Sequence, residues 1–307
     1  MKKDLVTEYD LEREDFEVIF ARARELKQFL KEGRPHPVLA GKTLGMIFEK
    51  ASTRTRLSFE VGMYQLGGLA LFLNTSDTQL GRGETVADTA KIMSRYLDGI
   101  MIRTYAQKTV EDLAAHAEIP VINGLTDLLH PCQILSDLFT IMEKKGDYRG
   151  VKLAYIGDGN NVANSWINVA ARLPVALSLA CPEGYDPDGE LLARARKEAP
   201  AGISIHRDPI AAVEGADIIY TDVWASMGQE GERELRARVF RSYQVNKNLL
   251  SRAKGDCIVM HCLPAHRGEE ITSEVIDGPH SVVLDQAENR LHVQKAILEI
   301  LMKKETR

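Results

Sequence analysis

Cysteine is scarce in this sequence: a chain of 307 residues contains only Cys132, Cys181, Cys257 and Cys262. Four thiols are too few for the disulfide framework of a chain this long, and none belongs to a CxxC pair. Zinc-ribbon and thioredoxin-like proteins are therefore not expected. We expect at least three of the four to be buried, reduced thiols of a cytoplasmic protein.

Long apolar runs and an excess of positive charge are absent as well. No apolar stretch approaches the roughly 18 residues that suggest a membrane span, and the acidic start lacks the apolar segment of a signal peptide. The 39 Lys and Arg residues against 44 Asp and Glu give a formal net charge of −5. We therefore expect no membrane association and no broad nucleic-acid-binding surface, although this balance leaves room for one local basic pocket.

Three common catalytic motifs are missing too. The sequence contains no P-loop GxxxxGK[ST], no HExxH and no GxSxG, so we expect no bound metal, no cofactor and no covalent acyl-enzyme. Residues 157–162 approach the dinucleotide fingerprint GxGxxG, but Val162 stands where the third glycine belongs. A nicotinamide-dependent oxidoreductase stays a distant alternative, because two α/β halves would suit it.

The hydrophobic pattern alternates between strands and helices along the chain. Helical spacing predicts helices at residues 15–31, 53–66, 86–97, 109–118, 131–145, 188–198, 246–253 and 286–303. Short apolar runs predict strands at 43–49, 99–102, 119–122, 152–156, 175–180, 203–206, 217–223, 257–262 and 281–285, with a long loop at 74–85. This alternation predicts an α/β fold with parallel sheets covered by helices on both faces.

A break in the pattern at residues 144–147 divides the chain. We predict two doubly wound domains, each a mostly parallel sheet flanked by helices. The first spans residues 1–146, with a C-terminal helix at 286–307 packing back on it, and the second spans residues 147–285. Ligands of such sheets bind beyond the carboxyl ends of the strands, so the residues at those ends are the candidate site.

The first strand end carries Ser-Thr-Arg-Thr-Arg at residues 52–56, where a predicted strand gives way to a helix. The free N–H groups and the dipole of a helix N-terminus attract an anion, and hydroxyl and guanidinium groups add donors. A plain helix cap with solvated arginines is the alternative. Three hydroxyls together with Arg54 and Arg56 within five residues favour a phosphate cradle.

Other strand ends carry Arg103, His130, Asp222 and Cys262. His130 precedes a predicted helix N-terminus, which disfavours the imidazolium. A neutral imidazole that donates to a carbonyl oxygen and a buried helix-capping histidine fit this segment equally well. Arg103 taken alone would pass as a surface residue. Taken together, the phosphate and carbonyl ligands of the first half and the carboxylate of the second suit transfer of an activated group from phosphate to an amine.

In this order, the motifs resemble the aspartate/ornithine carbamoyltransferase family over about residues 40–295. The residues that carry the resemblance are Ser52-Thr53-Arg54-Thr55, Arg103, His130-Pro131-Cys132-Gln133, Asp158-Gly159-Asn160-Asn161, Asp222 with Ser226-Met227-Gly228, and His261-Cys262-Leu263-Pro264.

The resemblance implies a role for each matching residue. Carbamoyl phosphate would be held by Ser52, Thr53, Arg54, Thr55, Gln79, Arg103, His130, Gln133, Arg290 and the backbone carbonyls of Cys262 and Leu263. Ornithine would be bound by Asn161, Asp222, Ser226 and Met227, and the catalytic groups would be Arg103, His130, Thr55 and Cys262. The loop around Gln79 would reach the site of a neighbouring subunit, which implies a homotrimer or a multiple of trimers.

The activity implied is transfer of the carbamoyl group of carbamoyl phosphate to the δ-amine of L-ornithine, a step of arginine metabolism, in the cytoplasm. An aspartate-specific relative should carry a lysine within 74–85 and a late Arg-Pro-Leu-Pro; this chain has no lysine between Lys50 and Lys91 and carries His-Cys-Leu-Pro at 261–264. Putrescine or another amine stays an alternative acceptor, although Ser226-Met227-Gly228 favours an amino acid. A non-catalytic interaction protein would leave the Ser/Thr/Arg cluster unexplained.

Overall fold

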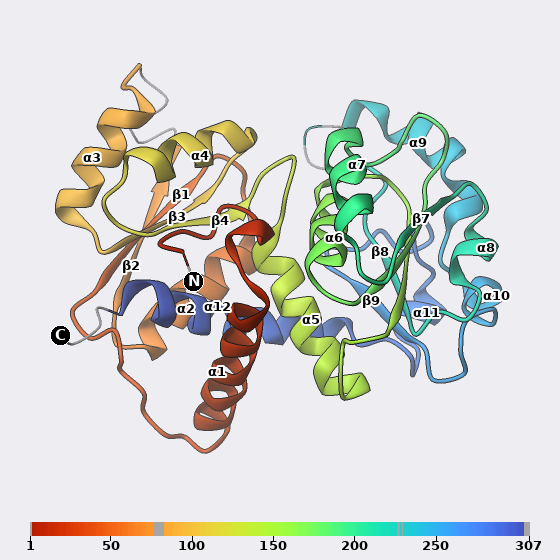
Figure 1. The fold of residues 1–307 in the computed structure, drawn as a ribbon, viewed down its shortest axis with the longest axis horizontal. Helices are drawn as coiled ribbons and strands as arrows, with labels where there is room; N and C mark the ends of the chain where they lie inside the picture. Colours follow the sequence, from red (N-terminus) through yellow and green to blue (C-terminus); the bar gives the residue numbers. More distant parts are fainter. Residues whose placement is uncertain (1, 76–82, 226–227, 229, 304–307) are drawn as a thin grey trace. The chain divides into compact units, whose positions relative to one another are not determined.

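The computed structural model describes residues 2–75, 83–225, 228 and 230–303 of the chain. These residues form two compact units (Figure 1): Met1–Phe139 with Glu288–Arg307, and Thr140–Ala287. Both divisions fall inside helices, namely α5 (Pro131–Lys145) and α12 (Val283–Met302), so each of these helices contributes residues to both units. The first division therefore lies seven residues earlier than the boundary expected after residue 146 (146 − 139).

The first unit is built on a four-stranded parallel sheet with the strand order β2-β1-β3-β4. Helices α3 and α4 lie on one side of this sheet, and α1, α2 and α12 lie on the other (Figure 1). The elements are η1 (Glu8–Asp10), α1 (Arg13–Lys31), β1 (Thr43–Phe48), α2 (Thr53–Gln65), β2 (Leu69–Asn74), α3 (Val86–Tyr96), β3 (Gly99–Arg103), α4 (Gln107–His116) and β4 (Val121–Leu125).

Side chains of the central strands alternate between the two layers of this unit. Ile47, Ile100 and Ile102 pack with Ala90 of α3 and Leu113 of α4 in one apolar cluster. Because successive strand residues point to opposite faces, the neighbours of these isoleucines are directed towards the other layer of helices. Burial on both faces explains why β1 and β3 are continuous apolar runs rather than alternating ones.

The second unit is built on a five-stranded parallel sheet with the strand order β7-β6-β5-β8-β9. Helices α6 and α7 lie on one side and α8, α10 and α11 on the other (Figure 1). The elements are β5 (Lys152–Ile156), α6 (Asn161–Arg172), β6 (Ala176–Ala180), α7 (Gly189–Glu198), β7 (Ile203–His206), α8 (Pro209–Val213), β8 (Ile218–Thr221), η4 (Glu230–Glu232), α9 (Arg233–Val239), η5 (Arg241–Tyr243), α10 (Lys247–Leu250), β9 (Ile258–His261) and α11 (Ser273–Ile276).

The predicted α/β class is confirmed. Two elements differ from the prediction: one strand was missed, and one expected among the described residues is absent. β2 was not expected, although its sequence LALFLN is an apolar run; it lies at the edge of the sheet, where Leu69, Leu71 and Phe72 are exposed. The strand expected at 281–285 is instead one parallel bridge, Val259 to Ser281, after which α12 begins at Val283. Within the residues described, no helix has both the length and the apolar character needed to cross a bilayer.

Each sheet has a point where the strand order reverses direction along the chain, which is where ligands of such sheets bind. In the first unit this point lies between β1 and β3, beyond the paired residues Phe48 and Arg103. In the second it lies between β5 and β8, beyond Ile156 and Thr221. The motifs singled out in the sequence follow these strand ends.

Lys295 is an unusual part of the first unit, because its side chain is fully buried on α12. Its Nζ donates to Gln65 Oε1 at 2.8 Å and lies 3.0 Å from His36 Nε2. Burial, with a smaller contribution from the charge of Arg22, lowers the pKa of Lys295 to about 8. The same physical cause lowers the pKa of His36, so the imidazole is neutral and accepts the lysine proton.

This lysine makes the stability of the protein depend on pH. The unfolded chain holds the lysine proton up to its ordinary value of 10.5, whereas the folded chain releases it near pH 8, so stability rises as pH increases through this interval. We expect the stability difference between the native protein and Lys295→Met to change by on the order of 1 kcal/mol between pH 7.5 and 9.5, in favour of the native protein at higher pH. Thermal unfolding midpoints at one fixed protein concentration measure this; parallel pH profiles would contradict it.

Candidate active site

The N-terminus of α2 forms a polar cradle at the end of β1. Ser52 is the N-cap, and its Oγ accepts a hydrogen bond from Thr55 N at 3.2 Å. This capping contact fixes the first turn and leaves the amides of that turn directed away from the helix. Thr53 is exposed and Arg54 half-buried on the same turn, so both stay accessible to a ligand.

The Thr55 hydroxyl joins this cradle to a residue far along the chain. Thr55 is fully buried, and its Oγ1 accepts hydrogen bonds from Ser52 Oγ at 3.0 Å and from Arg290 Nη2 at 2.9 Å. With two donors already directed at the oxygen, its own proton is available to donate to a ligand. The structure thus brings α2 and α12 together at this point, as the sequence motifs implied.

Two buried arginines surround the candidate histidine of this unit. Arg103, His130 and Arg290 are exposed by 8%, 4% and 3%. Burial, reinforced by the charges of Arg290 and Arg103, holds the pKa of His130 well below its ordinary value. His130 is therefore neutral near pH 7, as expected from its position before α5, and can donate a single hydrogen bond.

Gln133 lies one turn into α5 and presents a buried acceptor. Its Nε2 donates to Asp137 Oδ1 at 2.8 Å, which fixes the orientation of the amide. Its Oε1 is buried and has no hydrogen-bond partner among the residues that the structure describes. Because a buried acceptor without a donor costs about 1–3 kcal/mol, this oxygen is suited to receive the NH₂ group of a ligand.

Arg56 does not join this cluster, contrary to our expectation of a second phosphate-binding arginine. It is exposed, its Nε bonds Glu60 Oε1 at 2.9 Å, and its guanidinium lies 4.0 Å from the ring centroid of Phe72. The helical period explains this: Arg56 is two residues from Arg54 and therefore faces another side of α2.

In the second unit, the turn after β5 is shaped by Asn160. Its Oδ1 caps α6 by accepting hydrogen bonds from Val162 N at 2.9 Å and Ala163 N at 3.2 Å. A Cβ on the preceding Gly159 would lie 2.1 Å from Pro187 N, so only glycine fits. The amides that a dinucleotide pyrophosphate would need are thus already occupied, which adds to the argument against a nicotinamide-binding turn.

Asp222, directly after β8, receives hydrogen bonds from three sides. Asn160 Nδ2 donates to its Oδ2 at 2.8 Å, while Val223 N and Cys262 Sγ donate to its Oδ1 at 2.8 and 2.9 Å. Asn161, the first residue of α6, adjoins this group in sequence. A carboxylate and a thiol in direct contact form a local acceptor for a protonated amine.

Cys262 differs from the other three cysteines. Burial raises the pKa of Cys132, Cys181 and Cys257 to about 12, so these thiols are unreactive, as predicted for buried structural cysteines. Cys262 alone of the four is half-buried, next to Asp222.

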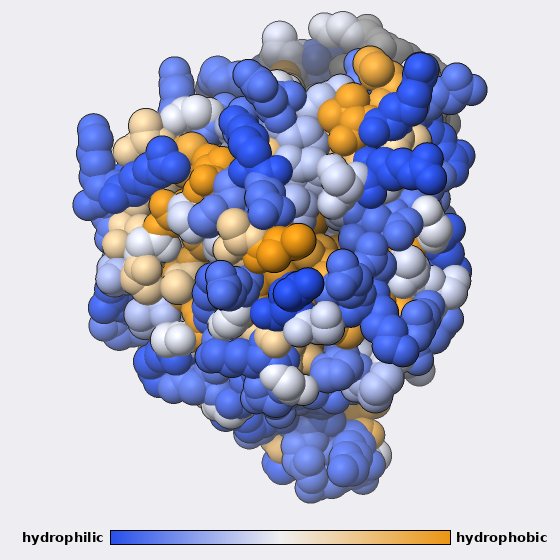
Figure 2. Space-filling view, turned by 90° about the vertical axis from the view of Figure 1, so that its right-hand side faces the viewer, coloured by the Kyte–Doolittle hydropathy of each residue, from blue (hydrophilic) through white to orange (hydrophobic). Residues whose placement is uncertain are grey.

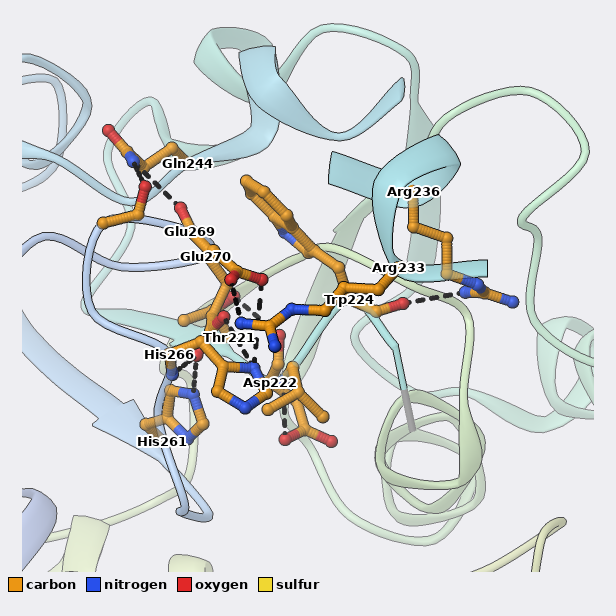
Figure 3. A network of polar contacts seen from close by, with 12 residues as sticks. Thr221, Asp222, Trp224, Arg233, Arg236, Gln244, His261, His266, Glu269 and Glu270 are labelled. Atoms are coloured by element: carbon orange, nitrogen blue, oxygen red, sulfur yellow. Dashed lines mark hydrogen bonds and ion pairs between the residues drawn. The ribbon is translucent and has the colours of Figure 1, made fainter. Parts of the chain in front are cut away.

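A fully buried pair, His261 and Glu270, holds the backbone beyond Cys262 (Figure 3). His261 Nδ1 accepts from Leu263 N at 2.9 Å, so the proton is on Nε2 and is donated to Glu270 Oε1 at 3.0 Å. Leu263 has a φ of 59°, a conformation that non-glycine residues rarely adopt. The histidine contact therefore fixes the carbonyl groups of Cys262 and Leu263 in an otherwise unfavourable conformation.

A second buried ion pair in this unit joins Arg236 of α9 to Asp158, at 3.2 Å. Arg236 also donates to Trp224 O at 2.8 Å (Figure 3) and to Glu232 Oε2 at 2.9 Å. Burial raises the pKa of Asp158 to about 6, and the Arg236 charge opposes that rise.

Neither Glu270 nor Arg236 was identified from the sequence as part of the candidate site, because charged side chains are normally exposed to solvent. The only available clue was that Glu270 follows the His-Cys-Leu-Pro motif closely. Gln79, Ser226 and Met227, three of the predicted site residues, lie outside the described residues.

Both units match known protein families by sequence. Residues 3–143 match "Aspartate/ornithine carbamoyltransferase, carbamoyl-P binding domain", and residues 149–301 match "Aspartate/ornithine carbamoyltransferase, Asp/Orn binding domain". The chain belongs to the aspartate/ornithine carbamoyltransferase family. It is therefore a carbamoyltransferase by family, and the resemblance inferred from the six motifs is confirmed.

Relatives of this family match the chain over almost its whole length. An ornithine carbamoyltransferase of Syntrophus aciditrophicus (strain SB) is 71% identical over 302 residues, covering 98% of this chain and 100% of that protein. The solved ornithine carbamoyltransferase of Pyrococcus furiosus is 55% identical, with a TM-score of 0.94 and coverage of 97% and 96%. That of Thermus thermophilus is 41% identical, with a TM-score of 0.89 and coverage of 99% and 100%.

The buried pair of His261 and Glu270 predicts that a substitution of Glu270 lowers the activity, although Glu270 contacts the candidate site only through His261. In Glu270→Ala, the Nε2 proton of His261 loses its acceptor, so the ring no longer holds Leu263. Because small displacements of catalytic groups are costly, we expect kcat/KM for carbamoyl transfer to fall roughly 10- to 100-fold. Glu270→Gln, which keeps an acceptor oxygen, should retain most of the activity.

Glu269→Ala is the matched control, because this neighbouring carboxylate does not touch His261. Activity is assayed in EDTA, so that bound metal ions do not contribute. Circular dichroism of each variant then separates a positioning effect from unfolding. Equal losses in Glu269→Ala and Glu270→Ala would contradict a specific role for the buried pair.

Proposed function

We propose that this protein transfers the carbamoyl group of carbamoyl phosphate to the δ-amine of L-ornithine, giving L-citrulline and phosphate. The observation that carries this proposal is the hydrogen bond from Arg290 to Thr55, which joins the helix-terminal cradle to the cluster around His130. A helix N-terminus, hydroxyls and guanidinium groups in one place match a small phosphorylated substrate. The ornithine carbamoyltransferase names of the relatives support the choice of substrates.

In the proposed arrangement, Ser52, Thr53 and Arg54 hold the phosphate of carbamoyl phosphate. Thr55, Arg103 and His130 donate to the carbamoyl oxygen, and Arg290 and Gln79 add further contacts. Arg54, Arg103 and Arg290 are permanently charged, so these three arginines supply fixed positive charge where phosphate would bind. Gln133 Oε1 and the carbonyl oxygens of Cys262 and Leu263 accept from the carbamoyl NH₂ group.

The chemistry follows from where charge develops. Attack of the neutral amine on the carbamoyl carbon makes a tetrahedral intermediate whose oxygen becomes negative. Each preorganised donor to such an oxygen is typically worth about 3–4 kcal/mol. Collapse of the intermediate breaks the C–O bond to phosphate, which leaves as an anion held by Arg54 and the α2 N-terminus. Neutral His130 can take part in this step, because its imidazole retains one N–H that can donate to the developing oxyanion.

The amine side of the reaction is assigned to the second unit. Asn161, Asp222, Ser226 and Met227 bind ornithine in this proposal, and Asp222 with Cys262 favours or receives the proton of the δ-amine. An amine of this type has a pKa near 10.4 in solution, so most of it is protonated at neutral pH. A carboxylate in contact with a thiol gives that proton a nearby acceptor.

Citrulline formation tests the proposal directly. Purified protein supplied with carbamoyl phosphate should carbamoylate ornithine in preference to putrescine and aspartate, measured by product formation at matched concentrations. The absence of product from all three amines would refute carbamoyl transfer, and a preference for putrescine would refute the assigned acceptor.

Two substitutions should separate the two substrates. Arg54→Ala should weaken carbamoyl phosphate binding at least 100-fold, because a guanidinium fork to a phosphate is a strong charged contact. Asp222→Ala should raise the KM for ornithine while leaving carbamoyl phosphate affinity unchanged, as measured by calorimetry. Normal carbamoyl phosphate affinity in Arg54→Ala would remove the phosphate assignment.

We also propose a homotrimer, or a multiple of it, acting in arginine metabolism in the cytoplasm. An exposed apolar patch supports self-association: Leu57, Val61 and Tyr64 of α2 are exposed by 54%, 38% and 81%, beside the edge strand β2. By contrast, the side of the second unit in Figure 2 shows separate small hydrophobic patches among hydrophilic residues. Exposed apolar side chains grouped on one helix face favour a protein contact.

Tyr64→Glu should therefore reduce the molecular mass of the assembly in light scattering, because a charge placed in a contact loses its hydration. Val18→Glu is the matched control, since Val18 is also exposed, by 55%, but lies on α1. A trimer-sized mass for Tyr64→Glu would argue against this patch as the contact surface.

A further inference from the structure

Three potential metal ligands lie together in the loop that follows the His-Cys-Leu-Pro motif. His266 Nδ1 lies 4.0 Å from Glu269 Oε2 and 4.0 Å from Glu270 Oε2 (Figure 3). The three ligand atoms all lie within 4.8 Å of one another. No motif in the sequence predicted this group, because the spacing differs from that of HExxH.

One of these ligands is a buried oxygen without a hydrogen-bond donor. Glu270 is fully buried, and its Oε1 is occupied by His261 Nε2 and by His266 N at 2.6 Å. Its Oε2 has no hydrogen-bond partner among the described residues and faces the His266 ring. A buried carboxylate oxygen of this kind is costly unless a proton donor or a cation approaches it.

The loop holds these ligands in place through its own backbone. Gln244 Nε2 donates to Gly268 O at 2.8 Å and to Glu269 O at 2.9 Å, while Gly268 adopts a φ of 87°. Arg233 bonds Glu269 through Oε1, which leaves Oε2 towards His266 (Figure 3). His266 is itself partly exposed, so an ion has access from solvent.

A neighbouring candidate group, Asp222 with His261 and Cys262, is a poorer site for a cation. Both ring nitrogens of His261 are already engaged, one by Leu263 N and the other by Glu270. A neutral imidazole then has no lone pair for a metal. His266 differs in that its ring forms no hydrogen bond with the residues that the structure describes, and its Nδ1 faces the two carboxylates.

We propose that His266, Glu269 and Glu270 form a binding site for a divalent cation of the zinc class. One imidazole and two carboxylates are a donor set that zinc accepts, with remaining positions filled by water. Ligand atoms each about 2.1 Å from a tetrahedral zinc lie roughly 3.4 Å apart, so the half-buried side chains of His266 and Glu269 would have to rotate inward to close the triangle. The site lies outside the residues assigned to the substrates and meets them only through Glu270 and His261.

Zinc binding to the full-length protein, stripped with EDTA, tests this site without substrates. Calorimetry should show one Zn²⁺ per chain, and His266→Gln should weaken binding at least 10-fold. His206→Gln, which changes a histidine elsewhere in the same unit, is the matched control and should bind normally. Arg233→Gln should bind more tightly, because it frees Glu269 and removes a nearby positive charge.

Cys262→Ser separates this site from binding at the thiol. Unchanged zinc affinity in Cys262→Ser, together with the loss in His266→Gln, supports the proposal. Affinity unaffected by His266→Gln, affinity lost only in Cys262→Ser, or no zinc binding would each overturn it. Because no substrate is present, none of these outcomes depends on which amine the enzyme carbamoylates.

Discussion

The Thr55 hydroxyl is the contact on which the candidate site of the first unit depends. It accepts from Ser52, which caps its own helix, and from Arg290, which lies 235 positions away. A buried guanidinium that lost this acceptor would retain its desolvation cost without the compensating bond. The same hydroxyl proton is available for a ligand, so the group that stabilises the first turn of α2 also prepares that turn for an anion. One oxygen atom therefore takes part both in the fold of this unit and in the proposed anion site.

In the second unit, the carboxylate of Glu270 holds a loop in place, as the Thr55 hydroxyl holds the first turn of α2. Glu270 fixes the tautomer of His261, and His261 in turn holds Leu263 at a positive φ. Such a conformation persists only where surrounding contacts over-determine it. The loop geometry at the end of β9 thus depends on Glu270 and His261, which are not among the proposed substrate contacts. The remaining oxygen of Glu270 connects this buried pair to the surface loop at His266.

How far the sequence predicts this molecule depends on the kind of interaction involved. Inner strand β3 was predicted from its apolar run, which is buried throughout. Edge strand β2 (LALFLN) carries an apolar run as well and was not predicted, and its exposure at the edge of the sheet is a property of the fold that the run itself does not show. Ser52 and His130 could be identified because strand ends and helix termini create their chemistry locally. Glu270 could not, since a glutamate is buried only when remote partners surround it. The outward direction of Arg56, by contrast, follows from the helical period of α2 and could have been predicted from its spacing from Arg54.

Burial, rather than the overall composition, decides which side chains carry charge at the candidate site. A net charge of −5 coexists with two buried arginines around His130. Burial, reinforced by the permanent charges of these two arginines, holds the pKa of His130 well below its ordinary value, so the histidine is the neutral partner. In the proposed reaction, the permanently charged arginines would attract the phosphate, and the neutral imidazole of His130 would donate to the carbonyl oxygen. Lys295 shows the other outcome of burying a cation. Unlike an arginine, a lysine can release its proton, and burial beside His36 lowers the pKa of Lys295. The protein therefore buries this lysine without a counter-ion in contact with it among the residues described.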